Sequence, residues 1–348
     1  MSEVNSFSLL SSRNELDYFP LQVVYEWEDI VASECKVSID VDNLTIVNAI
    51  FSKPINQFLQ KIIRNTFLHS YFDSSFNYFN KNKYIISFLL NPIPLKNHYL
   101  YRRNVILILL DVFSNNIDMI PEMFDNELIF VTNIEVLNYF KSHQIFNRLR
   151  YIPLSISDIY YDDAIPSKVI DIVQIGRQNT ILHEWMLQLI ANYPEIEYVY
   201  SKMESGKNVY ISNIRGTLND PTETRSDFMR FLGSAKISLV SSPGVDGGGE
   251  NRTGNFNPVT PRFYESAVKY CYMIGRFPDS PDFLLNDVKS VCERPNNYKE
   301  FEQLVLKMLS QPFNKKSKYD TFIKKHLTST IAKDVKIELD KIRRANFQ

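Results

Sequence analysis

Three short apolar runs in the first half of the chain limit the folds that it can adopt. They are "KYIISFLL" (83–90), "NVILILLDV" (104–112) and "ELIFVT" (127–132). Runs of this length that are apolar at successive positions are typical of parallel strands buried on both faces. Helical patterns lie between and around them, at 54–79, 118–124 and 134–143. The alternation predicts an α/β fold with a parallel sheet and crossover helices.

The same alternation starts again after residue 168. The predicted strands are 168–177, 196–201, 208–214, 236–242 and 271–276, and the predicted helices are 182–194, 226–235 and 261–270. Between the halves, a segment with Pro153, Pro166 and little periodicity indicates an interdomain linker. We predict a first domain at 1–155, a linker at 156–168, a second domain at 169–310 and a helical tail at 311–348.

Length and composition agree with two domains and exclude several classes of protein. A chain of 348 residues is long for one hydrophobic core. A net charge of -1 disfavours a general nucleic-acid binder. The N-terminus lacks the pattern of a signal peptide and no segment has the apolar length of a membrane span, so we expect a cytoplasmic protein. The three cysteines, at wide spacings, fit neither a disulfide framework nor a paired Cys-x-x-Cys metal site.

Five of the ten glycines crowd into one loop between the strand at 236–242 and the segment "TPRFYES". Ligands of open α/β sheets bind at the carboxyl ends of strands, where such loops lie. The chain has no Gly-Lys-Ser/Thr after this loop and no G-x-G-x-x-G before a helix. Kinase-type nucleotide hydrolysis and dinucleotide redox chemistry therefore lose their main support.

The segment after the glycine loop has the features of an anion site at a helix start. Thr260 is placed to cap the helix, Pro261 suits its first turn, and the helix dipole favours an anion there. Arg262 adds a charge suited to a phosphate, and Glu265 could accept hydrogen bonds from two sugar hydroxyls. A flexible surface loop, with Arg262 and Glu265 simply paired on the helix, explains the residues equally well.

Two segments resemble the donor-binding domain of glycosyltransferases with the GT-B fold, of the family 1/4-like type found among bacterial cell-surface polysaccharide enzymes. They are "VIDIVQIGRQN" and "ISLVSSPG…NPVTPRFYESAVKYCYMIGR", and "TPRFYE" is the most specific part. The resemblance covers 169–309. It implies two Rossmann-like domains facing a cleft, with C-terminal helices packing back, a nucleotide-sugar as co-substrate, and no other cofactor and no metal.

The resemblance also implies roles for single residues. Glu265 would bind the donor ribose and Arg262 the diphosphate, while backbone amides of the glycine loop would approach the donor. The donor-binding residues predicted in this way are Gly176, Arg177, Gly244, Gly247, Gly248, Thr260, Arg262 and Glu265. Many retaining members have a second glutamate where this chain has Asn257, so retention and inversion both stay open.

The first domain is expected to hold the acceptor and a general base. Asp111 ends the strand "NVILILLD" and is the first candidate, although a turn residue would look the same. Asp29, with Glu26 and Glu28 in "YEWEDI", is the second, although acidic residues around a turn are usually solvated. His98 and His183 are candidate donors to a sugar or phosphate. Asp40 and Asp42 could chelate a divalent ion but equally suit a turn.

These observations lead to one hypothesis and two alternatives. The hypothesis is a glycosyltransferase that moves a sugar from a nucleotide-sugar to a glycan or lipid-linked acceptor in lipopolysaccharide O-antigen or capsule biosynthesis. The expected location is the cytoplasm, with peripheral association at the inner face of the membrane left open. The alternatives are a sugar-nucleotide epimerase or phosphorylase of the same fold, and a non-catalytic nucleotide-sugar-binding scaffold protein.

Overall fold

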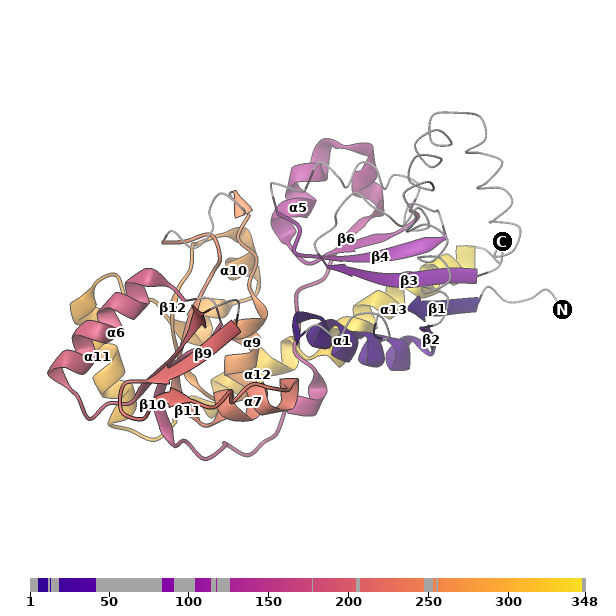
Figure 1. The fold of residues 1–348 in the computed structure, drawn as a ribbon. Helices are drawn as coiled ribbons and strands as arrows, with labels where there is room; N and C mark the ends of the chain where they lie inside the picture. The colour runs from indigo at the N-terminus through magenta and orange to yellow at the C-terminus, as the bar shows by residue number, and fades with distance from the viewer. Residues whose placement is uncertain are drawn as a thin grey trace, which may run out of the picture.

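The computed structural model shows two α/β domains, each built on its own sheet (Figure 1). The residues that it describes are 6–11, 13, 19–41, 83–90, 104–113, 117, 126–176, 178–204, 207–246, 253, 254 and 256–345. The predicted helices at 54–79 and 118–124 and the residues His98 and Asp42 lie outside them.

The first domain contains a six-stranded parallel sheet in the order β2-β1-β3-β4-β5-β6. Its strands are β1 (Ser6–Leu10), β2 (Ser38–Asp40), β3 (Lys83–Leu90), β4 (Val105–Leu110), β5 (Ile129–Val131) and β6 (Leu149–Tyr151). Every residue of β4 is buried, as expected for a central parallel strand covered on both faces. The three apolar runs of the sequence are thus confirmed as strands β3, β4 and β5.

The longest described helix of the first domain is α1 (Phe19–Cys35), and the sequence did not predict it. The expectation that Glu26, Glu28 and Asp29 surround a solvated turn is wrong, because "YEWEDI" is helical and Glu28 is only 2% exposed. Ser11 and Arg13 bind the Glu28 carboxylate and offset its burial. Three short helices lie between β5 and β6 in the sequence: α5 (Ile134–Tyr139), η3 (Phe140–Ser142) and η4 (Gln144–Arg148).

The second domain contains a seven-stranded sheet in the order β10-β9-β8-β7-β11-β12-β13. Its strands are β7 (Ile170–Gln174), β8 (Tyr198–Glu204), β9 (Lys207–Ser212), β10 (Gly216–Leu218), β11 (Ala235–Ser241), β12 (Tyr272–Arg276) and β13 (Cys292–Glu293). Strands β8, β9 and β10 form an antiparallel edge, and the other pairs are parallel. The parallel core therefore brings the ends of β7 and β11 to one edge.

The helices of the second domain begin where the sequence has capping residues. They are α6 (Thr180–Asn192), α7 (Arg225–Gly233), α9 (Pro261–Val268), α10 (Pro281–Leu285), the short η6 (Val288–Ser290) and α11 (Tyr298–Leu309). Asn179, Thr224 and Asn297 each accept a hydrogen bond from an amide in the first turn of the helix that follows.

The chain passes between the domains twice, along neighbouring paths. The first passage is the linker after β6, which contains η5 (Asp158–Tyr160). The second runs from α12 (Lys316–Lys325) to α13 (Thr328–Ala345), which packs against α1 of the first domain. Ile156 joins the two paths, because its amide donates to the His326 carbonyl at 2.9 Å and its carbonyl accepts from the Thr328 amide at 2.9 Å.

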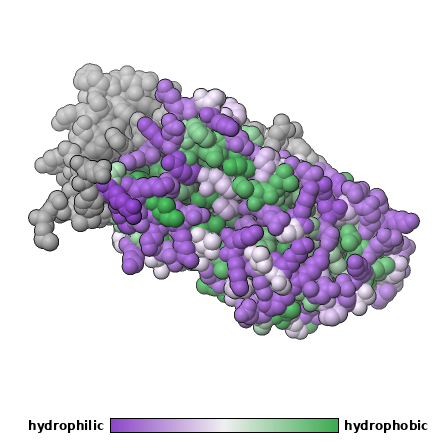
Figure 2. Space-filling view, turned by 180° about the vertical axis from the view of Figure 1, so that it is seen from behind, coloured by the Kyte–Doolittle hydropathy of each residue, from purple (hydrophilic) through white to green (hydrophobic). Residues whose placement is uncertain are grey.

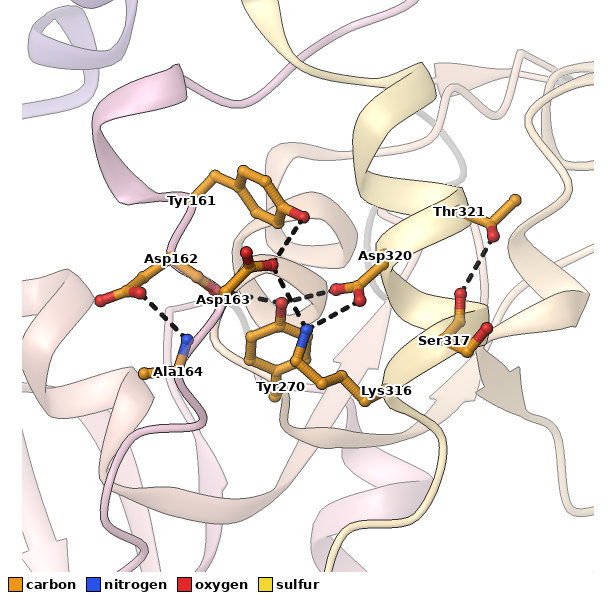
Figure 3. A network of polar contacts seen from close by, with 9 residues as sticks. All are labelled: Tyr161, Asp162, Asp163, Ala164, Tyr270, Lys316, Ser317, Asp320 and Thr321. Carbon is orange, nitrogen blue, oxygen red and sulfur yellow. Dashed lines mark hydrogen bonds and ion pairs between the residues drawn. The ribbon is translucent and has the colours of Figure 1, made fainter.

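Polar contacts attach the linker to α12 (Figure 3). Lys316 Nζ lies 2.8 Å from Asp320 Oδ2 within the helix and 3.4 Å from Asp163 Oδ1 of the linker. Tyr270, which follows α9, donates its hydroxyl to Asp320 Oδ1 at 2.6 Å. The linker is therefore fixed to the second domain by side chains from α12 and from the turn after α9.

The predicted fold class is confirmed: two Rossmann-like α/β domains lie side by side, and C-terminal helices pack back across the first. Seen from behind, the surface is mostly hydrophilic, with hydrophobic residues gathered toward the middle of the molecule (Figure 2). Within the described ranges, no helix combines the length and the apolar character that crossing a membrane would require.

Candidate active site in the interdomain cleft

A cleft open to solvent lies between the two domains. It collects the carboxyl ends of β3 and β4 from the first domain and of β7 and β11 from the second, which is the usual ligand position in open α/β sheets. The residues from the first domain are Val23, Val24, Trp27, Leu90, Leu110, Asp111, Phe113 and Leu154. The second domain contributes Gly176, Arg225, Thr260, Arg262 and Glu265, among others.

Glu265 lies between two arginines at the base of this cleft. Its Oε1 is 2.6 Å from Nη1 of Arg225, and its Oε2 is 3.1 Å from Nη1 of Arg262. The Glu265 residue is 3% exposed and Arg225 is 6% exposed. Burial alone would raise the pKa of the Glu265 carboxyl, but the two guanidinium groups outweigh burial and lower that pKa. Glu265 is therefore ionised at neutral pH despite being buried.

Several polar atoms of this cluster make no hydrogen bond within the described part of the protein. They are Nε and Nη2 of Arg225, Nη1 of Arg262 and Oε2 of Glu265. The Arg262–Glu265 contact is thus an ion pair without hydrogen-bond alignment. A buried polar atom that lacks a partner costs about 1–3 kcal/mol. A ligand that supplies both hydroxyl groups and anionic oxygens would satisfy these atoms.

The first domain reaches the same cluster through α1. Glu26 Oε1 lies 3.7 Å from Nε of Arg225 and accepts a hydrogen bond from the Tyr160 hydroxyl of the linker. Burial is the largest cause of the raised pKa of Glu26, and Arg225 opposes it. The guanidinium group of Arg225 therefore lies close to two carboxylates, Glu265 of the second domain and Glu26 of the first.

Helix α9 starts with the predicted residues, but the expected side-chain cap is not formed. Thr260 is at the N-cap position and Pro261 is in the first turn, yet the Thr260 side chain makes no capping hydrogen bond. The expectation that Thr260 caps the helix with its hydroxyl is therefore wrong for this structure. Thr260 still lines the cleft. Arg262, one residue further, packs its guanidinium group over the Phe228 ring at 4.4 Å from the ring centre.

Two predicted glycines occupy positions where a side chain would collide with the site. Gly176 has φ +85°, and a Cβ there would lie 2.9 Å from Nη2 of Arg262. A Cβ on Gly244 would lie 2.1 Å from Oδ1 of Asn257 and 2.6 Å from Oγ1 of Thr253. The backbone therefore comes close to Arg262 and Asn257 only because both positions are glycine.

The beginning of the glycine loop is fixed to the sheet through Asp246. Arg276, at the end of β12, binds both carboxylate oxygens of Asp246, at 2.8 and 2.9 Å, and Asn179 donates to it at 3.0 Å. The Arg276 hydrogen bonds are the largest cause of the lowered pKa of Asp246. Gly247, Gly248 and Arg177 lie outside the described residues.

Carboxylates from both domains hold the segment that leads into α9. Glu135 of α5 accepts a hydrogen bond from the Asn257 amide, and Asp282 of α10 accepts one from the Val259 amide at 2.7 Å. Asp282 is 1% exposed and also accepts from the Tyr151 hydroxyl of the first domain at 3.0 Å. Burial raises the pKa of Asp282 to about 6. The donor-side helix is thereby tied to the contact between the domains.

The two candidate bases of the first domain occupy different places. Asp111 follows β4, lines the cleft and has φ +53°, a conformation that costs energy for a residue other than glycine. Asp29 is on the exposed side of α1, where its carboxylate pairs with Arg13 at 2.8 Å, and it is not among the cleft residues. Asp111, but not Asp29, therefore lines the same cleft as Glu265 and Arg262.

The remaining candidates lie away from the cleft lining. His183 Nδ1 is 3.0 Å from the Tyr198 hydroxyl, and burial lowers the pKa of this histidine. Asp40 ends the edge strand β2. Across the described residues, no group of three or more His, Cys, Asp or Glu side chains is arranged to hold a metal ion.

Sequence reasoning missed Arg225 and undervalued Glu26. One signal for Arg225 was available: it is the first residue of α7, after the capping Thr224, and a positive charge at a helix N-terminus opposes the helix dipole. An arginine in that place needs an anion nearby. Nothing local identified Glu265, 40 positions later, as its partner.

The chain was compared with known proteins. Neither the models of protein families nor the curated sequences give a match. The search of solved structures gives matches of low similarity. UDP-GlcNAc 2-epimerase from Neisseria meningitidis bound to UDP-GlcNAc is 12% identical over 97% of this chain and 99% of that chain, with a TM-score of 0.49. T4 phage β-glucosyltransferase with UDP-glucose is 11% identical over 98% of each chain, with a TM-score of 0.42. The GtfA/B complex is 11% identical and scores 0.46, over 75% of this chain and 57% of that chain. These likenesses assign no substrate to this chain.

Proposed function

We propose that the protein is a glycosyltransferase that uses a nucleotide diphosphate sugar. The observation that carries the proposal is the Arg225–Glu265–Arg262 cluster at the N-terminus of α9, at the base of the cleft. Two arginines and a helix N-terminus suit a diphosphate, and an ionised carboxylate suits the adjacent ribose diol. No other described group in the cleft combines these chemistries.

The atoms of the cluster that make no hydrogen bond suit the hydroxyl and phosphate groups of such a donor. Oε2 of Glu265 has unused lone pairs that would accept from ribose hydroxyls, while Oε1 is held by Arg225. The nitrogen atoms of Arg225 and Arg262 that make no hydrogen bond would bind the phosphate oxygens. Because these atoms are buried, entry of a donor requires the contact between Glu26 and Arg225 to open.

Transfer would then proceed across the cleft. The acceptor hydroxyl oxygen forms a bond to the anomeric carbon of the sugar, the bond from that carbon to the diphosphate breaks, and the acceptor proton passes to a base. Among the described first-domain residues that line the cleft, Asp111 has the one carboxylate, and we assign it this role. Arg225 and Arg262 would stabilise the charge of the leaving diphosphate.

We place the reaction in the assembly of a cell-surface polysaccharide, with a glycan or a lipid-linked sugar as acceptor and the inner face of the membrane as the working location. What supports this placement is the resemblance of "TPRFYE" and its flanking segments to the glycosyltransferases named above. Product analysis with lipid-linked acceptors in membrane vesicles would test it.

Calorimetric titration with UDP, GDP, dTDP, CDP and CMP tests the donor site. Glu265→Gln should weaken binding of the preferred nucleotide about 10- to 100-fold, because a hydrogen bond to a charged group contributes roughly 1.5–3 kcal/mol. Glu197→Gln is the matched control, since Glu197 also pairs with an arginine, Arg215, but lies away from the cleft. If none of the five nucleotides binds, the proposal is wrong.

Mass spectrometry of the products separates transfer from its alternatives. Incubation with the preferred nucleotide-sugar and an acceptor should yield a glycosylated acceptor and free nucleoside diphosphate. An epimerised nucleotide-sugar without any acceptor product would identify an epimerase instead. Binding with neither product would identify a non-catalytic binding protein.

A further inference from the structure

Helix α1 of the first domain contacts α7 of the second domain (Figure 1). Two side chains one turn apart on α1, Gln22 and Glu26, meet Arg225 at the start of α7. Oε1 of Gln22 accepts a hydrogen bond from the Arg225 backbone amide at 3.2 Å. Oε1 of Glu26 lies 3.7 Å from Nε of the same arginine. Oxygen atoms of the first domain therefore lie at both the backbone amide and the side chain of Arg225.

The charges around Arg225 balance without any ligand. Arg225 and Arg262 carry two positive charges. Glu265 and Glu26 carry two negative charges when both are ionised. A diphosphate that entered this arrangement would bring its own negative charges next to two carboxylates in a buried place, which is costly. One carboxylate therefore has to move away before the arginines can pair with a diphosphate.

The two carboxylates differ in how firmly they are held. Glu265 is on α9, the same helix as Arg262, and its Oε1 lies 2.6 Å from Nη1 of Arg225. Glu26 belongs to the other domain, and its contact with Arg225 is longer. Among the described residues, neither Nε of Arg225 nor Oε2 of Glu26 makes a hydrogen bond. Separation of α1 from α7 would thus remove Glu26 and leave Glu265 in place.

We propose that Glu26 is an autoinhibitory group that takes the place of a donor phosphate beside Arg225 until a nucleotide displaces it. This inference rests on the proposed glycosyl transfer and specifies how its donor site is regulated. Gln22 contributes in the same way, because its oxygen holds the first amide of α7, which would otherwise be available to a phosphate oxygen. Nucleotide binding and the contact between α1 and α7 therefore exclude each other.

Calorimetric titration of Glu26→Gln with the nucleotide that the wild type prefers tests this inference. The variant should bind that nucleotide about tenfold more tightly, which is within the usual range of coupling between two sites. Glu265→Gln should bind it more weakly, so that the two carboxylates beside one guanidinium group give opposite results. Equal or weaker binding by Glu26→Gln would overturn the inference.

Glu34→Gln is the matched control. It removes the same charged group from the same helix, two turns further along α1 and away from the cleft. Its affinity for the nucleotide should equal that of the wild type. Equal tightening in Glu26→Gln and Glu34→Gln would show a general effect of charge and reject the inference. Urea unfolding of each variant checks that it is folded.

Glu26→Asp separates displacement from simple repulsion between Glu26 and the nucleotide. This substitution keeps the negative charge but shortens the side chain by one methylene, which moves the carboxylate further from Arg225 than 3.7 Å. If Glu26 has to be displaced, Glu26→Asp should also bind the nucleotide more tightly than the wild type does. Tighter binding by Glu26→Gln alone would indicate repulsion and would contradict an autoinhibitory contact.

A parallel titration with inorganic pyrophosphate, which lacks ribose and base, distinguishes this inference from the proposed function. Nucleotide binding by the wild type without any tightening in Glu26→Gln would keep the donor site and reject the autoinhibitory contact. Tighter pyrophosphate binding by Glu26→Gln, with no binding of any nucleotide, would reject the glycosyltransferase and leave an anion site that Glu26 blocks. If neither nucleotide nor pyrophosphate binds, both proposals are wrong.

Discussion

At the scale of single residues, Glu265 is a structural side chain as well as a candidate ligand. It offsets the charges of two arginines, and Arg225 is almost as buried as Glu265 itself. Removal of one partner from a buried ion pair leaves an uncompensated charge, which costs far more than the intact pair contributes. The role of Glu265 in binding must therefore be tested with a substitution that keeps its shape.

Glu265→Ala should lower the free energy of unfolding by roughly 3–5 kcal/mol, because it leaves Arg225 and Arg262 without their shared counter-charge. Urea unfolding at neutral pH measures the loss. Adding Arg225→Met to Glu265→Ala should recover part of it, since one buried charge is then removed. A loss below about 1 kcal/mol would show that solvent reaches these arginines.

The pairing of Arg262 with Glu265 shows how far sequence reasoning extends at this scale. Residues three apart on a helix are neighbours, so the pair was foreseeable from "TPRFYE". The Arg225–Glu265 and Glu26–Arg225 contacts join segments that are distant in sequence. No periodicity encodes such contacts, because they depend on how α1, α7 and α9 pack.

Among the secondary-structure elements, the turn after β7 leaves space for the Arg262 side chain. Gly176 and Gly216 both have φ in the left-handed region, at +85° and +73°. Only at Gly176 would an added Cβ meet another group, Nη2 of Arg262 at 2.9 Å; at Gly216 nothing lies within 4 Å. Both positions thus have a left-handed backbone conformation, but only Gly176 has a side chain close to where a Cβ would be.

Gly176→Ala and Gly216→Ala form a matched pair. Each should destabilise the protein by roughly 1–2 kcal/mol, the usual cost of a left-handed conformation for a residue with a Cβ. Only Gly176→Ala should also weaken nucleotide binding, about tenfold, because it displaces Arg262. Thermal unfolding and calorimetric titration measure the two effects. Equal nucleotide affinity in both variants would contradict a phosphate-binding role for Arg262.

Helices and strands with a clear pattern in their own sequence could be predicted, but helix α1 could not. Strand β4 is apolar at every position, and α6 has a capping asparagine and an apolar periodicity. In α1, the acidic residues of "YEWEDI" resemble a solvated turn. Glu28 is buried there because Ser11 and Arg13, beside β1, bind its carboxylate. The helix therefore depends on a contact that only the folded sheet creates.

At the scale of the whole molecule, Asp282 links stability to pH. The carboxylate accepts hydrogen bonds from Val259 on the donor side and from Tyr151 of the first domain. The pKa of Asp282 is raised from 3.8 to about 6, with burial as the largest cause. The native state therefore holds this proton in a range of pH where the unfolded state has lost it.

The contribution of Asp282 to stability should be largest below about pH 4 and should fall as pH rises to about 6, then stay constant. The difference between 3.8 and about 6 corresponds to about 3 kcal/mol. Urea unfolding of the wild type and Asp282→Asn between pH 4 and pH 7 measures it. The difference in stability between the two proteins should change by about this amount across the range. A constant difference would show that Asp282 does not carry the effect.

The contact between α1 and α13 also sets an order of assembly during synthesis. During synthesis, α1 leaves the ribosome early, whereas α13 leaves it only after every strand of the second sheet. The sheet and covering helices of residues 170–309 are contiguous in sequence and are complete before α13 is made. The apolar side of α1 must wait for Ile331, Val335 and Leu339 to cover it. The first domain is therefore completed after the second, although most of its strands are made earlier.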